Sequence, residues 1–127
     1  MLKNVGMTAY HLSSHVIDDI LSDGETLMTV AVGNNGERDA ALSLNRIQVP
    51  SDSVNALSVG AADRTGDDWK RASYSATGPG RSPGRRKPDV VAFGGAPKEY
   101  FHVAAPGARP NLAATLGTSF AAPLALR

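Results

Sequence analysis

The 127-residue sequence predicts an α/β fold, and two neighbouring patterns carry this prediction. Over residues 11–23, Leu12, Val16 and Ile20 recur at helical spacing. Residues 26–32 then form a nearly continuous apolar run, which is typical of a strand buried on both faces in a parallel sheet. The run ends in a turn rich in glycine and asparagine. Because active groups in α/β sheets collect at the carboxyl ends of strands, a site is expected at this turn.

The predicted helix has a polar side as well as an apolar one. Gly24 is a plausible helix stop. We expect three aspartates to face solvent: Asp18, Asp19 and Asp23. His11 and His15 are four residues apart, a spacing at which two histidines can share a metal. No third ligand is evident nearby, so exposed histidines at a helix start are favoured over a metal site.

Further strands are expected along the chain. Residues 56–62 predict a second strand, and residues 72–75 a short strand fragment. A strand is also expected within residues 87–95, and residues 100–104 predict an extra strand. Four basic residues lie between two of these segments, and without interleaved aromatic residues they indicate a solvated loop rather than a nucleic-acid surface: Arg81, Arg85, Arg86 and Lys87.

Composition excludes several classes of site. The formal net charge is +1, which gives no general case for a nucleic-acid or membrane partner. The chain has no cysteine, so disulfides, thiolate catalysis and cysteine-based zinc sites are excluded. No apolar run approaches the roughly 20 residues that a membrane span needs. The first residues also lack the apolar core of a signal peptide.

The stretch Gly117–Pro123 has the chemistry of a helix start. Serine and threonine cap first turns, and the alanines after them favour helix. Pro123 is expected close to the first turn, where a missing N–H costs least. The hydroxyl of Ser119 would then lie where negative charge is favoured. On local chemistry alone, an ordinary N-cap explains the serine.

This stretch resembles the serine motif of the subtilisin-like serine proteases, the subtilases. The turn at Gly33-Asn34 resembles the subtilase segment whose asparagine binds the oxyanion. Three further segments match the family in order along the chain: residues 49–63, 72–79 and 87–94. The resemblance implies that Ser119 is the nucleophile and Asn34 the oxyanion donor, with Asn35 as a less favoured alternative. Taken alone, the asparagines would indicate only a turn.

The resemblance also implies a fold and one wall of a substrate-binding pocket. The expected fold is the three-layer α/β subtilisin-like fold with a mostly parallel sheet, present only in part. One wall of the primary specificity pocket would be built from four residues before the asparagine: Val30, Ala31, Val32 and Gly33. We expect the opposing wall to lie outside this chain.

Parts of the family pattern are missing. The sequence contains neither an Asp-Ser/Thr-Gly motif nor a His-Gly-Thr-His motif, which in subtilases carry the acid and the base. His102 lacks the context of the catalytic histidine, and Phe93 replaces a proline that follows the strand in the family. Residues 1–127 are therefore interpreted as a partial subtilase catalytic domain, from the oxyanion asparagine to the start of the serine helix, without the Asp and His segments.

Two functions follow from this interpretation. The first is a serine endopeptidase acting on peptide or protein substrates in the full-length protein, with this fragment inactive alone. The alternative is a non-catalytic, degenerate subtilase module or assembly partner. In either case we expect apolar surface that favours self-association or binding of the missing N-terminal half. Subtilases often bind calcium and are often secreted, but no calcium ligands and no compartment can be assigned here. An unrelated α/β binding domain would require five ordered coincidences.

Overall fold

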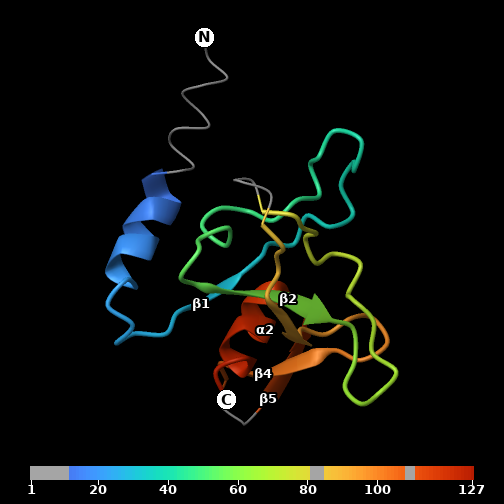
Figure 1. Ribbon diagram of the computed structural model, residues 1–127. Coiled ribbons are helices and arrows are strands. Elements are labelled where there is room, and N and C mark those ends of the chain that lie inside the picture. Colours follow the sequence, from blue (N-terminus) through green and yellow to red (C-terminus); the bar gives the residue numbers. More distant parts are fainter. Residues whose placement is uncertain (1–11, 81–84, 108–110) are drawn as a thin grey trace.

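A computed structural model of the chain describes residues 12–80, 85–107 and 111–127. Residues 12–20 form an N-terminal helix, and the later elements follow in the order β1 (Thr29–Ala31), β2 (Leu57–Ala62), β3 (Val90–Phe93), β4 (Phe101–Ala105), β5 (Asn111–Thr115) and α2 (Thr118–Leu124) (Figure 1). Among the residues so described, no helix is long and apolar enough to cross a membrane.

The central feature is a three-stranded parallel sheet in the order β1-β2-β3. The middle strand pairs on both sides, with Ser58 opposite Val30 and Gly60 opposite Val91. All of β2 after its first residue is buried, as expected for a parallel sheet covered on both faces. The predicted α/β class and the predicted strand at residues 56–62 are thereby confirmed.

The first strand is shorter than the apolar run that predicted it. Regular pairing covers Thr29–Ala31 only, while Leu27 and Met28 are exposed. The expectation of a strand over all of residues 26–32 is wrong, because β2 offers partners only from Leu57 onward. Within the described chain, β1 is an edge strand.

Helix α2 covers one face of the sheet. Small side chains allow it to approach β2 closely, in a core cluster formed by Val59, Ala61, Ala72, Tyr74, Ala121 and Ala122. Complete burial of a valine such as Val59 stabilises a fold by roughly 1.5–3 kcal/mol. Gly117, not Ser119, occupies the N-cap position. Pro123 lies inside α2 and not in its first turn, which corrects the expected position of the proline.

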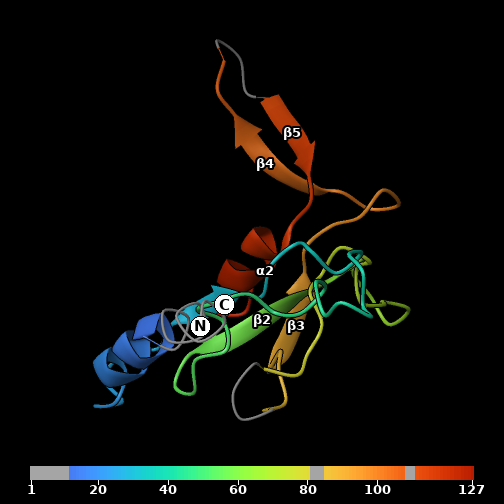
Figure 2. The ribbon, with the colours of Figure 1, turned by 90° about the horizontal axis from the view of Figure 1, so that it is seen from above.

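An antiparallel hairpin made of β4 and β5 lies between β3 and α2 in the sequence. The extra strand predicted at residues 100–104 is confirmed as β4, whereas β5 was not predicted. Figure 2 shows the hairpin projecting away from the sheet on the side of α2. Phe101 at its base stacks between Phe93 and Phe120, with ring centroids 5.8 and 5.2 Å apart. Phe93, the departure from the family pattern, therefore anchors the hairpin.

The N-terminal helix is held by its polar side. The Ser14 hydroxyl donates to Asp52 at 2.6 Å, and Asp18 accepts the backbone N–H of Asn55 at 2.7 Å. The apolar stripe faces solvent, with exposed fractions of 65% for Leu12, 49% for Val16 and 64% for Ile20. No described element covers this stripe, so it is apolar surface of the kind that the sequence analysis expects.

Two other local predictions need correction. The helix predicted over residues 11–23 is helical at 12–20 and continues as turns, and residue 11 lies outside the described part of the chain. Residues 72–75 form a turn rather than a strand, closed by the N–H of Ser75 donating to the carbonyl of Ala72 at 2.9 Å.

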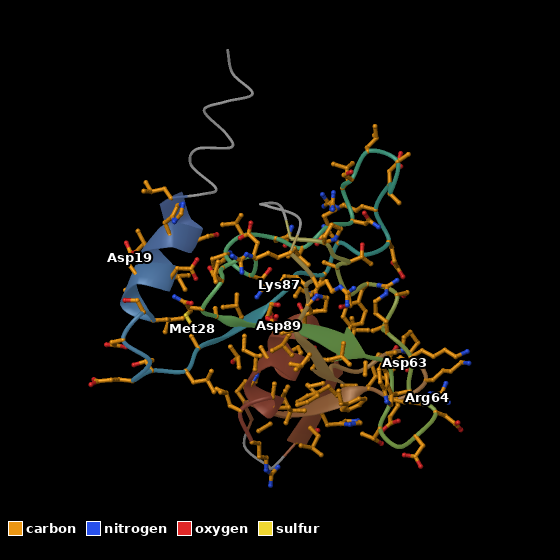
Figure 3. All side chains as sticks on the ribbon, in the orientation of Figure 1. Asp19, Met28, Asp63, Arg64, Lys87 and Asp89 are labelled. Atoms are coloured by element: carbon orange, nitrogen blue, oxygen red, sulfur yellow. The ribbon has the colours of Figure 1, made fainter. Side chains whose placement is uncertain are left out.

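An ion pair between buried Lys87 and the more exposed Asp89 ties β2 to the start of β3. Lys87 Nζ donates to Asp89 Oδ2 at 2.7 Å and to the Ala56 carbonyl at 3.2 Å. The same carboxylate oxygen accepts from the N–H and the hydroxyl of Ser58, each at 2.7 Å. Figure 3 shows Lys87 and Asp89 lying together, far from the Asp63–Arg64 pair in the loop after β2. Lys87 is thus buried and not part of the solvated basic loop that was predicted, while Arg81 lies outside the described residues.

The environment of Asp89 keeps it ionised. Desolvation alone would raise its pKa. The hydrogen bonds from Lys87 and Ser58, together with the Lys87 charge, outweigh desolvation and lower the pKa of the carboxyl below its ordinary value.

Candidate active site

Asn34 lies in the turn that follows β1, and Thr118 fixes its orientation. The Asn34 Oδ1 accepts the Thr118 backbone N–H at 2.9 Å and the Thr118 hydroxyl at 3.0 Å. The same hydroxyl accepts the N–H of Gly33 at 3.3 Å. Because Oδ1 is held by both donors, the Nδ2 group of Asn34 points away from Thr118. It remains available as a neutral hydrogen-bond donor.

Ser119 follows Thr118 directly and begins the exposed side of α2. It is solvent-accessible, whereas Thr118 is 1% exposed. Ser119 and Asn34 line the same cavity, of about 410 Å³. Two segments that are 84 residues apart in the chain, joined by the Asn34–Thr118 contact, therefore build one site.

The four residues predicted to form a substrate wall do not all line this cavity. Ala31 and Gly33 line the cavity, but Val30 does not. Val32 is fully buried in a separate cluster with Ile47 and Ala76. Successive strand residues point to opposite faces, so four consecutive residues cannot all line one wall.

Three further residues of this chain line the cavity, while the predicted opposing wall of the specificity pocket stays a prediction. The three are Asn35, Arg38 and Gln48. The sequence offered no motif for Arg38 or Gln48, because their positions depend on how the loop over residues 36–48 returns to the turn. Gly33 makes this return possible: its φ is +108°, and a Cβ there would lie 2.6 Å from Gln48 Oε1.

Asn35, the alternative oxyanion donor, is committed elsewhere. Its Nδ2 donates to the carbonyls of Leu44 and Arg46 at 2.6 and 2.8 Å. The side chain is 8% exposed and organises the returning loop. The geometry therefore favours Asn34 over Asn35 as the donor that faces a ligand.

Tyr74 supports the segment before the serine. Its hydroxyl donates to the Gly95 carbonyl at 2.7 Å and accepts the N–H of Gly117 at 3.1 Å. Burial raises the pKa of this hydroxyl, and the hydrogen bond from Gly117 offsets only part of that effect. The tyrosine hydroxyl thus adds a polar link between the end of β3 and the start of α2. Sequence analysis did not predict this link.

The histidines lie elsewhere. His15 belongs to the N-terminal helix and His102 to β4, and neither lines the cavity. His11 falls outside the described residues. In the part of the chain that the structure describes, no three histidine, aspartate or glutamate side chains gather as they would around a metal ion.

The parallel sheet and α2 together bring a helix-start serine and an oriented asparagine to one cavity of an α/β fold. The family model described as Subtilase family matches residues 6–126, and the chain belongs to this family of serine peptidases. No match was found among curated proteins.

Solved structures of similar fold include proteases. A structure of the patellamide maturation protease PatG has a TM-score of 0.58 at 22% identity, over 85% of this chain and 28% of that one. A psychrophilic protease has a TM-score of 0.58 at 27% identity, over 84% and 33% of the two chains. The prenylagaramide maturation protease PagA has a TM-score of 0.52 at 26% identity, over 84% and 31%. The chain thus spans about a third of the length of these structures.

Proposed function

We propose that this chain supplies the nucleophile and the oxyanion donors of a serine endopeptidase. The observation that carries the proposal is the double hydrogen bond from Thr118 to Asn34 Oδ1, because it occupies the amide oxygen and leaves Nδ2 as the donor of a residue that lines the same cavity as Ser119. The family supports peptide or protein substrates in general.

In the proposed reaction, Ser119 Oγ attacks the carbonyl carbon of the scissile peptide bond and gives its proton to a base. The carbonyl oxygen becomes an oxyanion, which accepts hydrogen bonds from Asn34 Nδ2 and the Ser119 backbone N–H. Collapse of the intermediate breaks the C–N bond: the protonated base gives its proton to the leaving nitrogen, the amine product departs, and an acyl-enzyme ester remains on Ser119. Water, giving a proton to the base, then attacks this ester, and its C–O bond to Ser119 breaks to release the carboxylic acid product and regenerate the hydroxyl.

The base and its orienting acid are proposed to come from segments outside residues 1–127. The two motifs that carry them in the family are absent from the sequence, and neither described histidine lines the cavity. The chain is then a partial catalytic domain that hydrolyses peptides negligibly by itself. Its partner would be the missing N-terminal half or a second copy of the chain, binding in part over the exposed stripe of Leu12, Val16 and Ile20.

A fluorophosphonate probe tests this proposal, since it reacts with a serine only when a base activates it. Residues 1–127 alone should remain unlabelled. The polypeptide that includes the upstream Asp and His segments should label stoichiometrically, and its Ser119→Ala variant should not. Stoichiometric labelling of the isolated chain would contradict the missing-base proposal.

The same exposed stripe favours the second candidate, a non-catalytic subtilase module that acts in assembly. The two candidates share one fold and differ in the upstream sequence. If the upstream coding region lacks both an Asp-Ser/Thr-Gly and a His-Gly-Thr-His motif, the non-catalytic module is the correct one.

A further inference from the structure

We propose that the cavity beside Ser119 selects a carboxamide side chain, glutamine or asparagine, at the substrate residue whose carbonyl is attacked. The inference rests on the proposed function for the position of that residue. It depends on three polar groups of this chain that line the cavity: Asn35, Arg38 and Gln48.

The first group is an unpaired acceptor. Asn35 Oδ1 is buried, and no donor of the described chain reaches it. Turning the amide over would not solve this, because Nδ2 already donates to the carbonyls of Leu44 and Arg46. A buried acceptor left without a partner costs about 1–3 kcal/mol. A ligand that brings an N–H donor to this oxygen removes that cost.

The acceptor lies beside Gly33, which also lines the cavity. A Cβ at Gly33 would lie 2.8 Å from Asn35 Oδ1 and 2.6 Å from Gln48 Oε1, so the two polar groups flank the space that glycine leaves open. Gln48 can present either end of its amide to a ligand, since its side chain forms no hydrogen bond that fixes it among the described residues. The cavity is therefore polar beside Gly33.

The third group is a cation. Arg38 lines the cavity, is exposed, and forms no ion pair within the described ranges. A guanidinium only donates hydrogen bonds. The cavity thus combines an unpaired acceptor with a positively charged donor.

A carboxamide complements both groups. Its NH₂ can donate to Asn35 Oδ1 while its oxygen accepts from Arg38. A carboxylate would pair with Arg38 but place negative charge against the Asn35 oxygen, and an ammonium would be repelled by Arg38. An apolar side chain would leave both groups unpaired. The cavity has a volume of about 410 Å³, so its size does not exclude a glutamine side chain.

Product-like peptides test the proposal without requiring catalysis. Acetyl-Ala-Ala-Gln, acetyl-Ala-Ala-Glu and acetyl-Ala-Ala-Met carry side chains of nearly equal length and differ in their terminal groups. Each is titrated into the ¹⁵N-labelled 127-residue chain, and the dissociation constant is read from NMR shifts of the Asn35 side-chain amide and the Arg38 Nε–H. We expect the Gln peptide to bind about tenfold more tightly than either of the others.

Two variants test whether Arg38 causes the preference for the Gln peptide. Arg38→Met removes the charge and keeps a side chain of similar length. It should reduce the logarithm of the ratio between the dissociation constants of the Met and Gln peptides by at least half. Arg64→Met is the matched control, because Arg64 lines a different cavity, and it should leave all three affinities unchanged.

Equal affinities, tighter binding of Met or Glu, or no binding by any peptide would each overturn the proposed selectivity. Failure of the proposed catalytic function has a different signature. Ser119 of the complete protease would not label with the fluorophosphonate, although the Gln peptide would still bind with the predicted preference.

Discussion

Two donors of Thr118 bind the side-chain oxygen of Asn34: the Thr118 backbone N–H at 2.9 Å and the Thr118 hydroxyl at 3.0 Å. The hydroxyl is the substitutable part of this contact. Thr118→Val removes it while keeping the shape of the side chain, so Asn34 loses one of two orienting bonds and Gly33 loses its acceptor. Loss of an oxyanion donor costs roughly 10²–10³ in kcat in subtilisin, and we expect about a tenfold loss for this indirect change.

The measurement is kcat and KM of the full-length protease on a peptide substrate. The loss should appear in kcat, because the oxyanion exists only in the transition state. Thr118→Ser keeps the hydroxyl and should retain most of the activity. A Thr118→Val enzyme with unchanged kcat would show that Thr118 does not position Asn34 for catalysis.

Tyr74→Phe should destabilise the protein. The variant keeps the ring in the core and removes the hydroxyl that joins Gly95 to Gly117. The Gly117 N–H keeps its hydrogen bond to the Gly94 carbonyl at 2.9 Å, whereas the Gly95 carbonyl loses its donor. Leaving this one acceptor without a partner should lower the free energy of unfolding by about 1–3 kcal/mol, measured by urea denaturation. Tyr100→Phe is the control, since Tyr100 is exposed, and it should change stability by less than about 0.5 kcal/mol. Equal effects of the two variants would contradict the role assigned to Tyr74.

The Lys87–Asp89 pair makes stability depend on acid pH. The pKa of Asp89 is lower in the folded protein than in the unfolded chain, so its contribution is fully present above the unfolded value of about 3.9. The contribution is lost as the pH falls from there through the lower, folded pKa. Stability in urea should therefore decrease across this window.

Asp89→Asn should remove much of that acid dependence and should cost about 2 kcal/mol at neutral pH, because buried Lys87 loses its counter-ion. Asp67→Asn, at an exposed position, serves as the control and should preserve the pH dependence of the parent protein. If both variants retain the acid transition, the pair is not its source.

The exposed stripe on the N-terminal helix should drive association. Replacing Leu12, Val16 and Ile20 together by glutamine should weaken self-association of the chain, or its binding to the N-terminal half, by at least about tenfold. Sedimentation velocity over a range of concentrations measures the effect. Leu112→Gln, at a 66% exposed position on β5, is the control. An equal effect of the control would point to non-specific aggregation instead.

The sequence predicted best where local pattern and family motif agree. The strand at residues 56–62 is a buried apolar run with parallel neighbours on both sides, so its pattern and its environment coincide. The helix at residues 12–20 is amphipathic in sequence, yet its apolar side faces solvent, because periodicity identifies a helix and does not supply what covers it.

The site was predicted in outline and missed in detail. Ser119 and Asn34 belong to recognisable motifs, and both line the cavity, while their catalytic roles remain predictions. Gln48 and Arg38 reach the same cavity through a loop of irregular shape, which no periodicity describes. In the sequence, Lys87 belongs to a run of basic residues. In the structure, Asp89 accepts a hydrogen bond from the Lys87 ammonium, and this contact allows Lys87 to be buried.

The separation of Asn34 and Thr118 by 84 residues has a consequence for synthesis of the protein. The Asn34 turn leaves the ribosome long before the threonine that orients it, and β2 acquires its second neighbour only when β3 has been made. Non-local contacts of this kind form slowly, since the chain between them must first be closed into a loop. A nascent chain therefore carries an unoriented asparagine until α2 emerges, and the Asn34–Thr118 contact is among the last features of this chain to form.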